Sequence, residues 1–141
     1  MSTIAQRPDF SGEWKLNPQA SRLGPAVAPV VRSGTLKILH CEPRFASQLA
    51  IEFADKPVES KFELVSDGRE VVADHKGQRI VSSLRWDGDA LVATWQIHAP
   101  DSELVIAFRY ELQDDGRRLQ AAEHLRGGGR DQDNVWVFDR S

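Results

Sequence analysis

The sequence predicts an all-β fold, namely a single antiparallel up-and-down β-barrel of eight to ten strands. Ten short runs of the chain alternate apolar with polar residues, which is the period of a strand with one buried face. Turn-forming pairs such as Asp-Gly separate most of these runs, and almost no segment has helical periodicity. Consecutive antiparallel strands in this number favour a barrel, because closure removes exposed strand edges.

The predicted strands follow one another with short connections. They cover residues 10–16, 35–41, 47–53, 61–66, 70–75, 80–86, 89–97, 104–112, 119–125 and 134–138. The chain of 141 residues has the length of one domain, so we expect residues 1–9 to be a flexible lead and residues 10–141 to form the barrel.

One longer connection interrupts this series at residues 17–33. It holds Pro18, Pro25 and Pro29, which exclude a long helix. We therefore predict an extended loop with at most one helical turn, near residues 19–23.

The hairpin at residues 80–97 shows the strand pattern most clearly. Asp87-Gly88 lies between its two arms, and Asp-Gly is favoured in type I′ turns. A two-residue loop at this point predicts that Trp86 faces Asp89. The next predicted pairs are Leu84 with Leu91, Ser82 with Ala93, and Ile80 with Trp95. This register puts the apolar side chains of both arms on one face.

Three other turns are predicted in the same way. Asp67-Gly68 predicts a hairpin in which Leu64 faces Val71 and Phe62 faces Ala73. Lys76-Gly77 predicts a tight turn that sets His75 opposite Gln78. A further turn is expected at residues 114–116.

Composition narrows the class of partner. The formal net charge is -3 and the pI is about 5.8, which argues against nucleic acid as a partner. Cys41 is the single cysteine, so no intrachain disulfide forms, and we expect its thiol to be inert. No run is long enough for a membrane span, and the N-terminus lacks the apolar core of a signal peptide. We expect a cytoplasmic monomer or homodimer, or a secreted or periplasmic protein if a signal peptide was removed.

The first predicted strand carries a resemblance to a known family. Its residues Phe10-Ser-Gly-Glu-Trp-Lys-Leu16 resemble the Phe-x-Gly-x-Trp-Lys-Leu start of the calycin superfamily, which holds the lipocalins and fatty-acid-binding proteins. The resemblance implies a calycin-like barrel in which Trp14 plugs the closed end. The last strand, 135–140, resembles that of fatty-acid-binding proteins. The first strand and the turn at 86–89 together look like those of bacterial lipocalin-like proteins of mostly unassigned function.

Two departures change what the resemblance implies. Fatty-acid-binding proteins hold the ligand carboxylate with an arginine and a tyrosine on the last strand, where this chain has Trp136 and Phe138. Their two-helix lid is replaced here by the proline-containing loop. The expected ligand is therefore a neutral or aromatic molecule rather than a fatty acid.

The same resemblance allows the inward face to be predicted. The residues expected to bind the ligand are Trp95, Tyr110, Trp136, Phe138, Phe62, Phe108 and Ile51. The polar residues expected among them are His40, Ser66, His75, Ser82, Tyr110 and Glu123. Apolar walls with a few placed polar groups are typical of small-molecule pockets. The alternative is that the aromatic side chains simply fill the core.

Glu123 is the candidate for acid–base chemistry. It lies between Ala121 and Leu125 on an apolar face, where burial can raise the pKa of a carboxyl group. The hypothesis of an enzyme assigns catalytic roles to Glu123, His40, His75 and Tyr110. The alternative, which we favour, is that Glu123 reaches solvent or pairs with an arginine. His98 and His124 are expected on the outer face.

No metal site or cofactor is predicted. The four histidines lack ligand spacing, and residues 131–134 are interpreted as a solvated turn rather than a calcium loop. Three functions remain open. The chain binds a small hydrophobic or aromatic molecule; or it is an isomerase, cyclase, hydratase or lyase on the same scaffold; or it is a protein-interaction module with a filled barrel.

Overall fold

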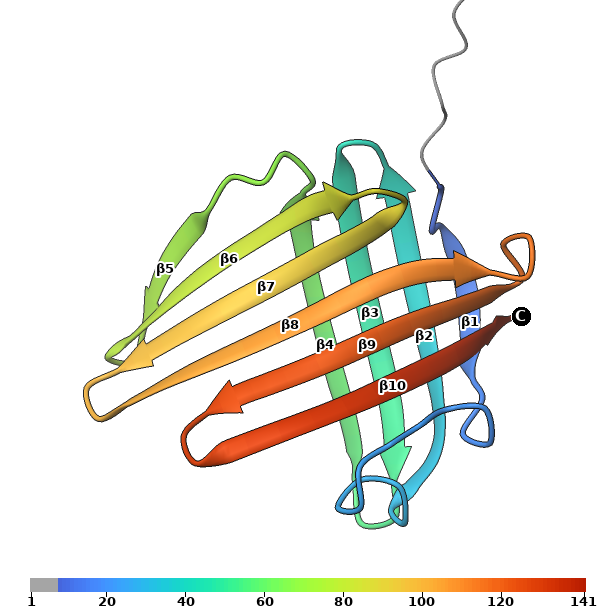
Figure 1. Cartoon of the computed structure of the whole chain (residues 1–141), viewed down its shortest axis with the longest axis horizontal. Helices are drawn as coiled ribbons and strands as arrows, with labels where there is room; N and C mark the ends of the chain where they lie inside the picture. Colours follow the sequence, from blue (N-terminus) through green and yellow to red (C-terminus); the bar gives the residue numbers. More distant parts are fainter. Residues whose placement is uncertain (1–7) are drawn as a thin grey trace, which may run out of the picture.

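The computed structural model describes residues 8–141, and these form one antiparallel sheet of ten strands (Figure 1). The strands are β1 (Gly12–Leu16), β2 (Val31–Cys41), β3 (Arg44–Phe53), β4 (Pro57–Val65), β5 (Val71–His75), β6 (Gln78–Asp87), β7 (Ala90–Ala99), β8 (Ser102–Gln113), β9 (Arg118–Gly127) and β10 (Arg130–Arg140). The predicted all-β, up-and-down fold class is confirmed, but the sheet curls into a half-barrel with β4 and β5 as its edges, so the expected closure is not complete in the described residues. Most of the predicted flexible lead, residues 1–7, lies outside the described residues.

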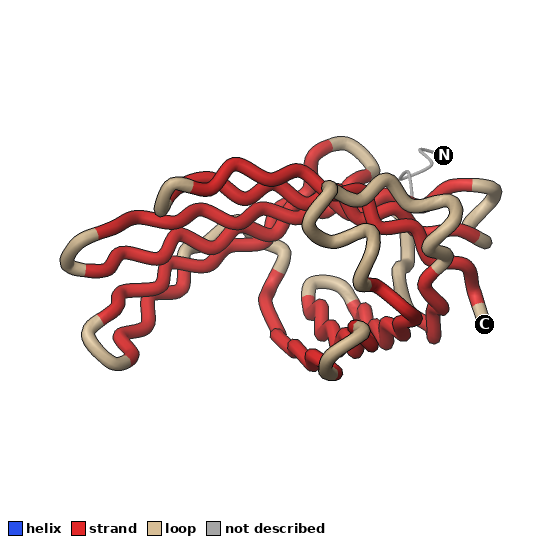
Figure 2. The backbone as a smooth tube through the Cα atoms, turned by 90° about the horizontal axis from the view of Figure 1, so that it is seen from below, coloured by secondary structure: helices blue, strands red, loops and turns tan. Residues whose placement is uncertain are grey.

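The sheet folds over on itself into two facing layers. Its strand order is β4-β3-β2-β1-β10-β9-β8-β7-β6-β5, so the short β1 connects the first half of the chain to the last strand. In Figure 1, β6 to β10 cross obliquely over β2 to β4, and Figure 2 shows the two layers curling away from a shared edge. The core lies between the layers. Its largest fully buried side chains are Trp14, Phe10, Phe45, Phe138, Ile38, Leu84, Leu91 and Leu119.

Alternation along each strand explains which side chains reach this core. In β2, Leu36, Ile38 and His40 are buried while their neighbours Lys37 and Leu39 are exposed. A period of two places every second side chain on the same face of the sheet. The two layers therefore present their apolar residues to each other.

The hairpin predicted at Asp67-Gly68 is wrong. β4 and β5 are the two edges of the sheet, and no strand ladder joins them in the described part of the chain. The backbone N–H of Gly68 donates to the carbonyl of Leu84 at 2.9 Å, and Asp67 forms a bridge with Arg85. The segment thus crosses to β6 instead of turning back on β4. An Asp-Gly pair signals a turn but does not select the strand that follows it.

The hairpin of β6 and β7 forms, but its register differs from the predicted one by two residues. Trp86 faces Leu91 rather than Asp89, and Leu84 faces Ala93. Its loop is Gly88-Asp89, with φ of 62° at Gly88, and glycine at the first central position is typical of a type II′ turn. The sequence reading placed the turn one residue early. A shift by two residues preserves the faces, so the predicted apolar face is unchanged.

The turn at Lys76-Gly77 sets His75 opposite Gln78 as expected, with positive φ at both turn residues. Residues 17–30 form turns without a helix.

Residues 131–134, interpreted as a solvated turn, are instead part of β10, and Asn134 is buried. None of the described residues forms a helix that is long and apolar enough to cross a membrane.

The loop of residues 17–30 is tied to β10. The backbone N–H of Asn17 donates to the carbonyl of Val137 at 2.7 Å, and Arg22 pairs with Val135. Gly24 donates from its backbone N–H to Oδ1 of Asn134 at 2.7 Å. Leu23 and Val27 pack against the core. These contacts hold the loop against the barrel even though it has no regular structure.

Candidate functional site

A cavity of about 380 Å³ lies between the two layers. One wall comes from β2, β3 and β4, and the other from β6 to β10. This volume falls within the roughly 300–1,000 Å³ of typical small-molecule pockets. The cavity is lined mainly by apolar side chains, with few polar groups among them, and it is partly open to solvent. Those polar residues are Ser47, Ser60, Lys61, Tyr110 and Glu123.

Aromatic rings contact one another along this cavity. Trp95 meets Phe62 edge-to-face across the two layers, with ring centroids 4.9 Å apart. Phe108 lies 6.2 Å from Trp95 and stacks on Tyr110 at 6.0 Å. Phe45 continues the series into the core, 5.6 Å from Tyr110. Aromatic pairs in these geometries add to the stability from burial and hold the walls in defined positions.

All seven predicted ligand-binding residues line this cavity. They are Trp95, Tyr110, Trp136, Phe138, Phe62, Phe108 and Ile51. Strand alternation places them on one face, and the curl of the sheet brings that face around a common space. Their role in binding a ligand stays a proposal.

Glu123 projects from β9 to the same cavity and is held by two neighbours on β10. Its Oε1 accepts hydrogen bonds from Nδ2 of Asn134 at 3.1 Å and from Nε1 of Trp136 at 3.0 Å. The side chain is partly buried. The side chain of Glu123 is partly exposed, as the favoured alternative expected. Its partners in the described chain are an amide and an indole rather than an arginine.

Tyr110 lies next to Glu123 on the adjacent strand. Because Tyr110 pairs with Ala121, Glu123 is its diagonal neighbour on the same face. Burial raises the pKa of Tyr110, and the negative charge of Glu123 raises it further. The phenol therefore stays protonated at neutral pH. Its hydroxyl makes no hydrogen bond within residues 8–141, so it remains available as a donor.

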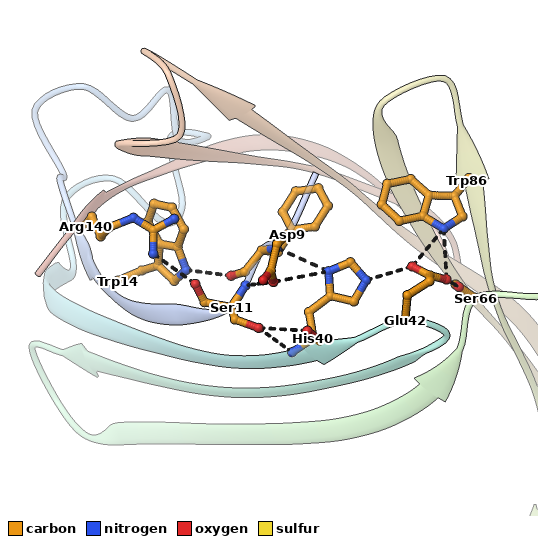
Figure 3. A network of polar contacts seen from close by, with 9 residues as sticks. Asp9, Ser11, Trp14, His40, Glu42, Ser66, Trp86 and Arg140 are labelled. Carbon is orange, nitrogen blue, oxygen red and sulfur yellow. Dashed lines mark hydrogen bonds and ion pairs between the residues drawn. The ribbon is translucent and has the colours of Figure 1, made fainter. Parts of the chain in front are cut away.

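His40 lies away from the cavity, at the end of the barrel that holds Trp14. Its Nδ1 accepts a hydrogen bond from the backbone N–H of Phe10 at 3.2 Å, so the ring proton is on Nε2, which contacts Glu42 at 2.9 Å (Figure 3). The ring also packs among Phe10, Phe45 and Trp86. The structure does not bring His40 together with Glu123, because these contacts hold it in a separate network.

Glu42 is the centre of that network (Figure 3). It accepts hydrogen bonds from the hydroxyl of Ser66 and from Nε1 of Trp86, in addition to its contact with His40. Partial burial opposes ionisation of Glu42, but these hydrogen bonds outweigh it and hold the pKa of the carboxyl below its ordinary value. The network thereby joins β2, β6 and the segment after β4.

Trp14 takes the buried position that the resemblance implied. Its side chain is fully buried, and Nε1 donates to the carbonyl of Phe10 at 3.1 Å. The guanidinium of Arg140 lies over the indole at 4.1 Å from the ring centroid. This cation–π contact covers the tryptophan from the outside.

The other histidines do not reach the cavity. His75 is exposed on β5, so its predicted inward position is wrong; β5 is a short edge strand with no exposed-to-buried alternation. His98 contacts Glu103 at 2.6 Å, and His124 contacts Asp133 at 2.6 Å, each on the outer face. Of the four predicted catalytic residues, the cavity brings together Glu123 and Tyr110 only.

Sequence reasoning missed two polar residues that the structure makes important. Glu42 lies two positions after His40, and this spacing is the signal that could have placed both on one side. Asn134 shares the parity of Trp136 and Phe138, but the surrounding acidic residues suggested a turn. Cys41 is an exposed free thiol. No group of three or more His, Cys, Asp or Glu side chains that could hold a metal is found in the described part of the chain.

Comparison with known proteins finds its matches at the level of structure. No family model and no curated protein sequence matches the chain. A secretory abundant heat soluble protein from Ramazzottius varieornatus superposes with a TM-score of 0.62 at 16% identity, covering 93% of this chain and 94% of that one. Human cRBP IV gives a TM-score of 0.57 at 17% identity, with coverages of 95% and 99%.

A third solved structure is similar over the same extent. The Schistosoma mansoni fatty acid binding protein, in complex with arachidonic acid, has a TM-score of 0.50 at 16% identity, with coverages of 94% and 96%. All three are calycin-like barrels. The chain therefore has the calycin fold of the fatty-acid-binding-protein type, as its first strand suggested. At these identities the likeness defines the fold alone.

Proposed function

We propose that this protein binds a small hydrophobic or aromatic molecule in the cavity between its two layers. The observation that supports the proposal is the cavity of about 380 Å³, walled by Trp95, Trp136, Phe108 and other apolar side chains. Burial of apolar ligand surface against such walls contributes roughly 25 cal/mol per Å² before the costs of association. A cavity of this size also argues against the filled-barrel interaction module.

The structural neighbours support the same proposal. Human cRBP IV is a cellular retinol-binding protein, and the Schistosoma protein holds arachidonic acid. The positions of Trp136 and Phe138 on the last strand leave the cavity without the arginine and tyrosine of a fatty-acid clamp. The proposed ligand therefore differs from a fatty acid in its polar group. The enzyme hypothesis is the weaker one, because His40 and His75 lie outside the cavity.

A fluorescent probe tests the proposal directly. N-phenyl-1-naphthylamine is neutral at pH 7, and its emission rises when it leaves water. We expect saturable binding to the wild type with one probe per chain. Trp136→Ala should weaken binding at least severalfold, because it removes one wall of the cavity. Trp86→Phe is the matched control, since Trp86 does not line the cavity, and it should bind like the wild type. Absence of saturable binding by folded wild-type protein would refute the proposal.

A further inference from the structure

The two oxygens of the Glu123 carboxylate are used differently. Oε1 accepts both available hydrogen bonds, from Asn134 and Trp136. No donor contacts Oε2 within residues 8–141. Both partners of Oε1 are N–H groups that cannot take a proton, so the carboxylate is held as an acceptor at the wall of the cavity. Oε1 is thus used in hydrogen bonds within the protein, whereas Oε2 can accept a hydrogen bond from a ligand in the cavity.

The remaining charges around the cavity do not neutralise Glu123. Lys61 is the one basic side chain among the described residues of the wall. Its side chain is exposed. It also borders a depression on the outside of β2 to β4, which Lys37 and Glu63 line as well. No arginine is found among the described residues that line the cavity. The interior therefore has a net acceptor character.

The aromatic walls favour the same sign of ligand charge. Trp95, Trp136 and Phe108 line the cavity together with Glu123. The faces of such rings carry partial negative charge and attract cations, and the indole of tryptophan does so more strongly than the rings of tyrosine and phenylalanine. A carboxylate ligand would meet both these rings and Glu123 unfavourably.

From these contacts, and on the basis of the proposed function, we infer that the cavity takes a protonated amine carried on an apolar or aromatic body, with its ammonium group paired to Oε2 of Glu123. The Tyr110 hydroxyl, which has no partner in the described chain, is a donor for a second polar atom of the same ligand.

The physical reason for this preference is the free-energy cost of displacing water from the cavity. An apolar ligand displaces the water that solvates Oε2, and a buried acceptor without a partner is costly. A neutral hydroxyl restores one hydrogen bond. An ammonium group restores a charge-assisted one, which is roughly twice as strong. The difference corresponds to about a tenfold preference for the amine over an otherwise identical alcohol.

Three probes of one shape separate these possibilities. They are 1-naphthylmethylamine, 1-naphthylmethanol and 1-naphthoate, titrated at pH 7 by isothermal calorimetry. We expect the wild type to bind the amine about tenfold more tightly than the alcohol, and the naphthoate most weakly. In Glu123→Gln the amine and the alcohol should bind within about twofold of each other. The glutamine keeps Oε1 as an acceptor for Asn134 and Trp136, so the fold is preserved.

A matched variant controls for net charge. Glu52→Gln removes one negative charge from the exposed outer side of β3, away from the cavity, and should keep the full preference for the amine. If none of the three probes binds, the proposed function itself fails. If the alcohol binds as tightly as the amine, or naphthoate binds best, the inference about charge is overturned while hydrophobic binding stands. A preference that survives in Glu123→Gln would also overturn it.

Discussion

The indole Nε1 of Trp136 donates a hydrogen bond to Oε1 of Glu123 at 3.0 Å, across the ladder between β10 and β9. This contact fixes the ring plane of a cavity wall and the direction of the carboxylate at the same time. Two residues that sequence reasoning assigned to separate roles, ligand binding and catalysis, thus form one structural unit.

Trp136→Phe removes the indole donor while keeping an aromatic ring. We expect the free energy of unfolding to fall by about 1 kcal/mol, because Glu123 loses one of two hydrogen bonds in a partly buried position. Urea denaturation followed by circular dichroism measures the change. An unchanged midpoint would mean that water replaces the indole without cost.

Phe45→Ala should be among the most damaging single changes. Its ring is fully buried and contacts the rings of Phe10, His40 and Tyr110. Large-to-small changes of buried aromatic residues cost roughly 3–5 kcal/mol. Leu39→Ala is the control, since Leu39 is 75% exposed, and it should change stability by less than about 0.5 kcal/mol. Similar losses from both variants would contradict the burial assigned to Phe45.

Glu42 predicts a specific dependence of stability on pH. Its pKa in the folded protein is lower than the ordinary 4.5, so ionised Glu42 favours the folded state above that pH. The contribution is lost as the pH falls through the folded-state pKa. The difference in unfolding free energy between the wild type and Glu42→Gln should therefore be larger at pH 7 than at pH 3. Comparing the pair cancels the other acidic groups, and a difference that is constant with pH would contradict this prediction.

Gly127 and Gly128 should respond differently to alanine. Both have positive φ, but a Cβ at Gly127 would collide with the carbonyl oxygen of Glu103, whereas one at Gly128 meets nothing within 4 Å. We expect Gly128→Ala to cost about 1–2 kcal/mol from backbone strain and Gly127→Ala to cost clearly more. Thermal unfolding of the two variants side by side gives the comparison. Equal melting temperatures would show that the chain relaxes around Gly127.

Most of the correct predictions came from the alternation of apolar and polar residues along the strands. Parity, together with the inward side implied by the resemblance, put Trp95, Tyr110 and Trp136 on the inner face, and all three line the cavity. Parity does not report distance along the barrel axis. His40 and Glu123 share the inner face, yet one lies in the Trp14 end and the other in the cavity wall. This is why a catalytic group composed from inward residues did not assemble.

Turn residues predicted the positions and partners of the strands less completely. Gly88 marked the β6–β7 turn, but its loop begins one residue later than expected. Asp67-Gly68 marked a change of direction, but its hydrogen bond to Leu84 and its bridge with Arg85 are made to a strand that follows later in the chain. A dipeptide encodes its own backbone preference and has no information about a partner so far along the sequence.

The sequence by itself determined the class of fold, the strand order along the chain and the apolar face of most strands, because these depend on local alternation and on turn residues. Only the tertiary structure decided that β4 and β5 do not pair with each other in the described chain, that Glu42 joins His40 to Trp86, and that Glu123 is directed by Asn134 and Trp136. Those contacts join residues far apart in sequence. Their free energy depends on the distance and direction between side chains, which exist only after the sheet has curled.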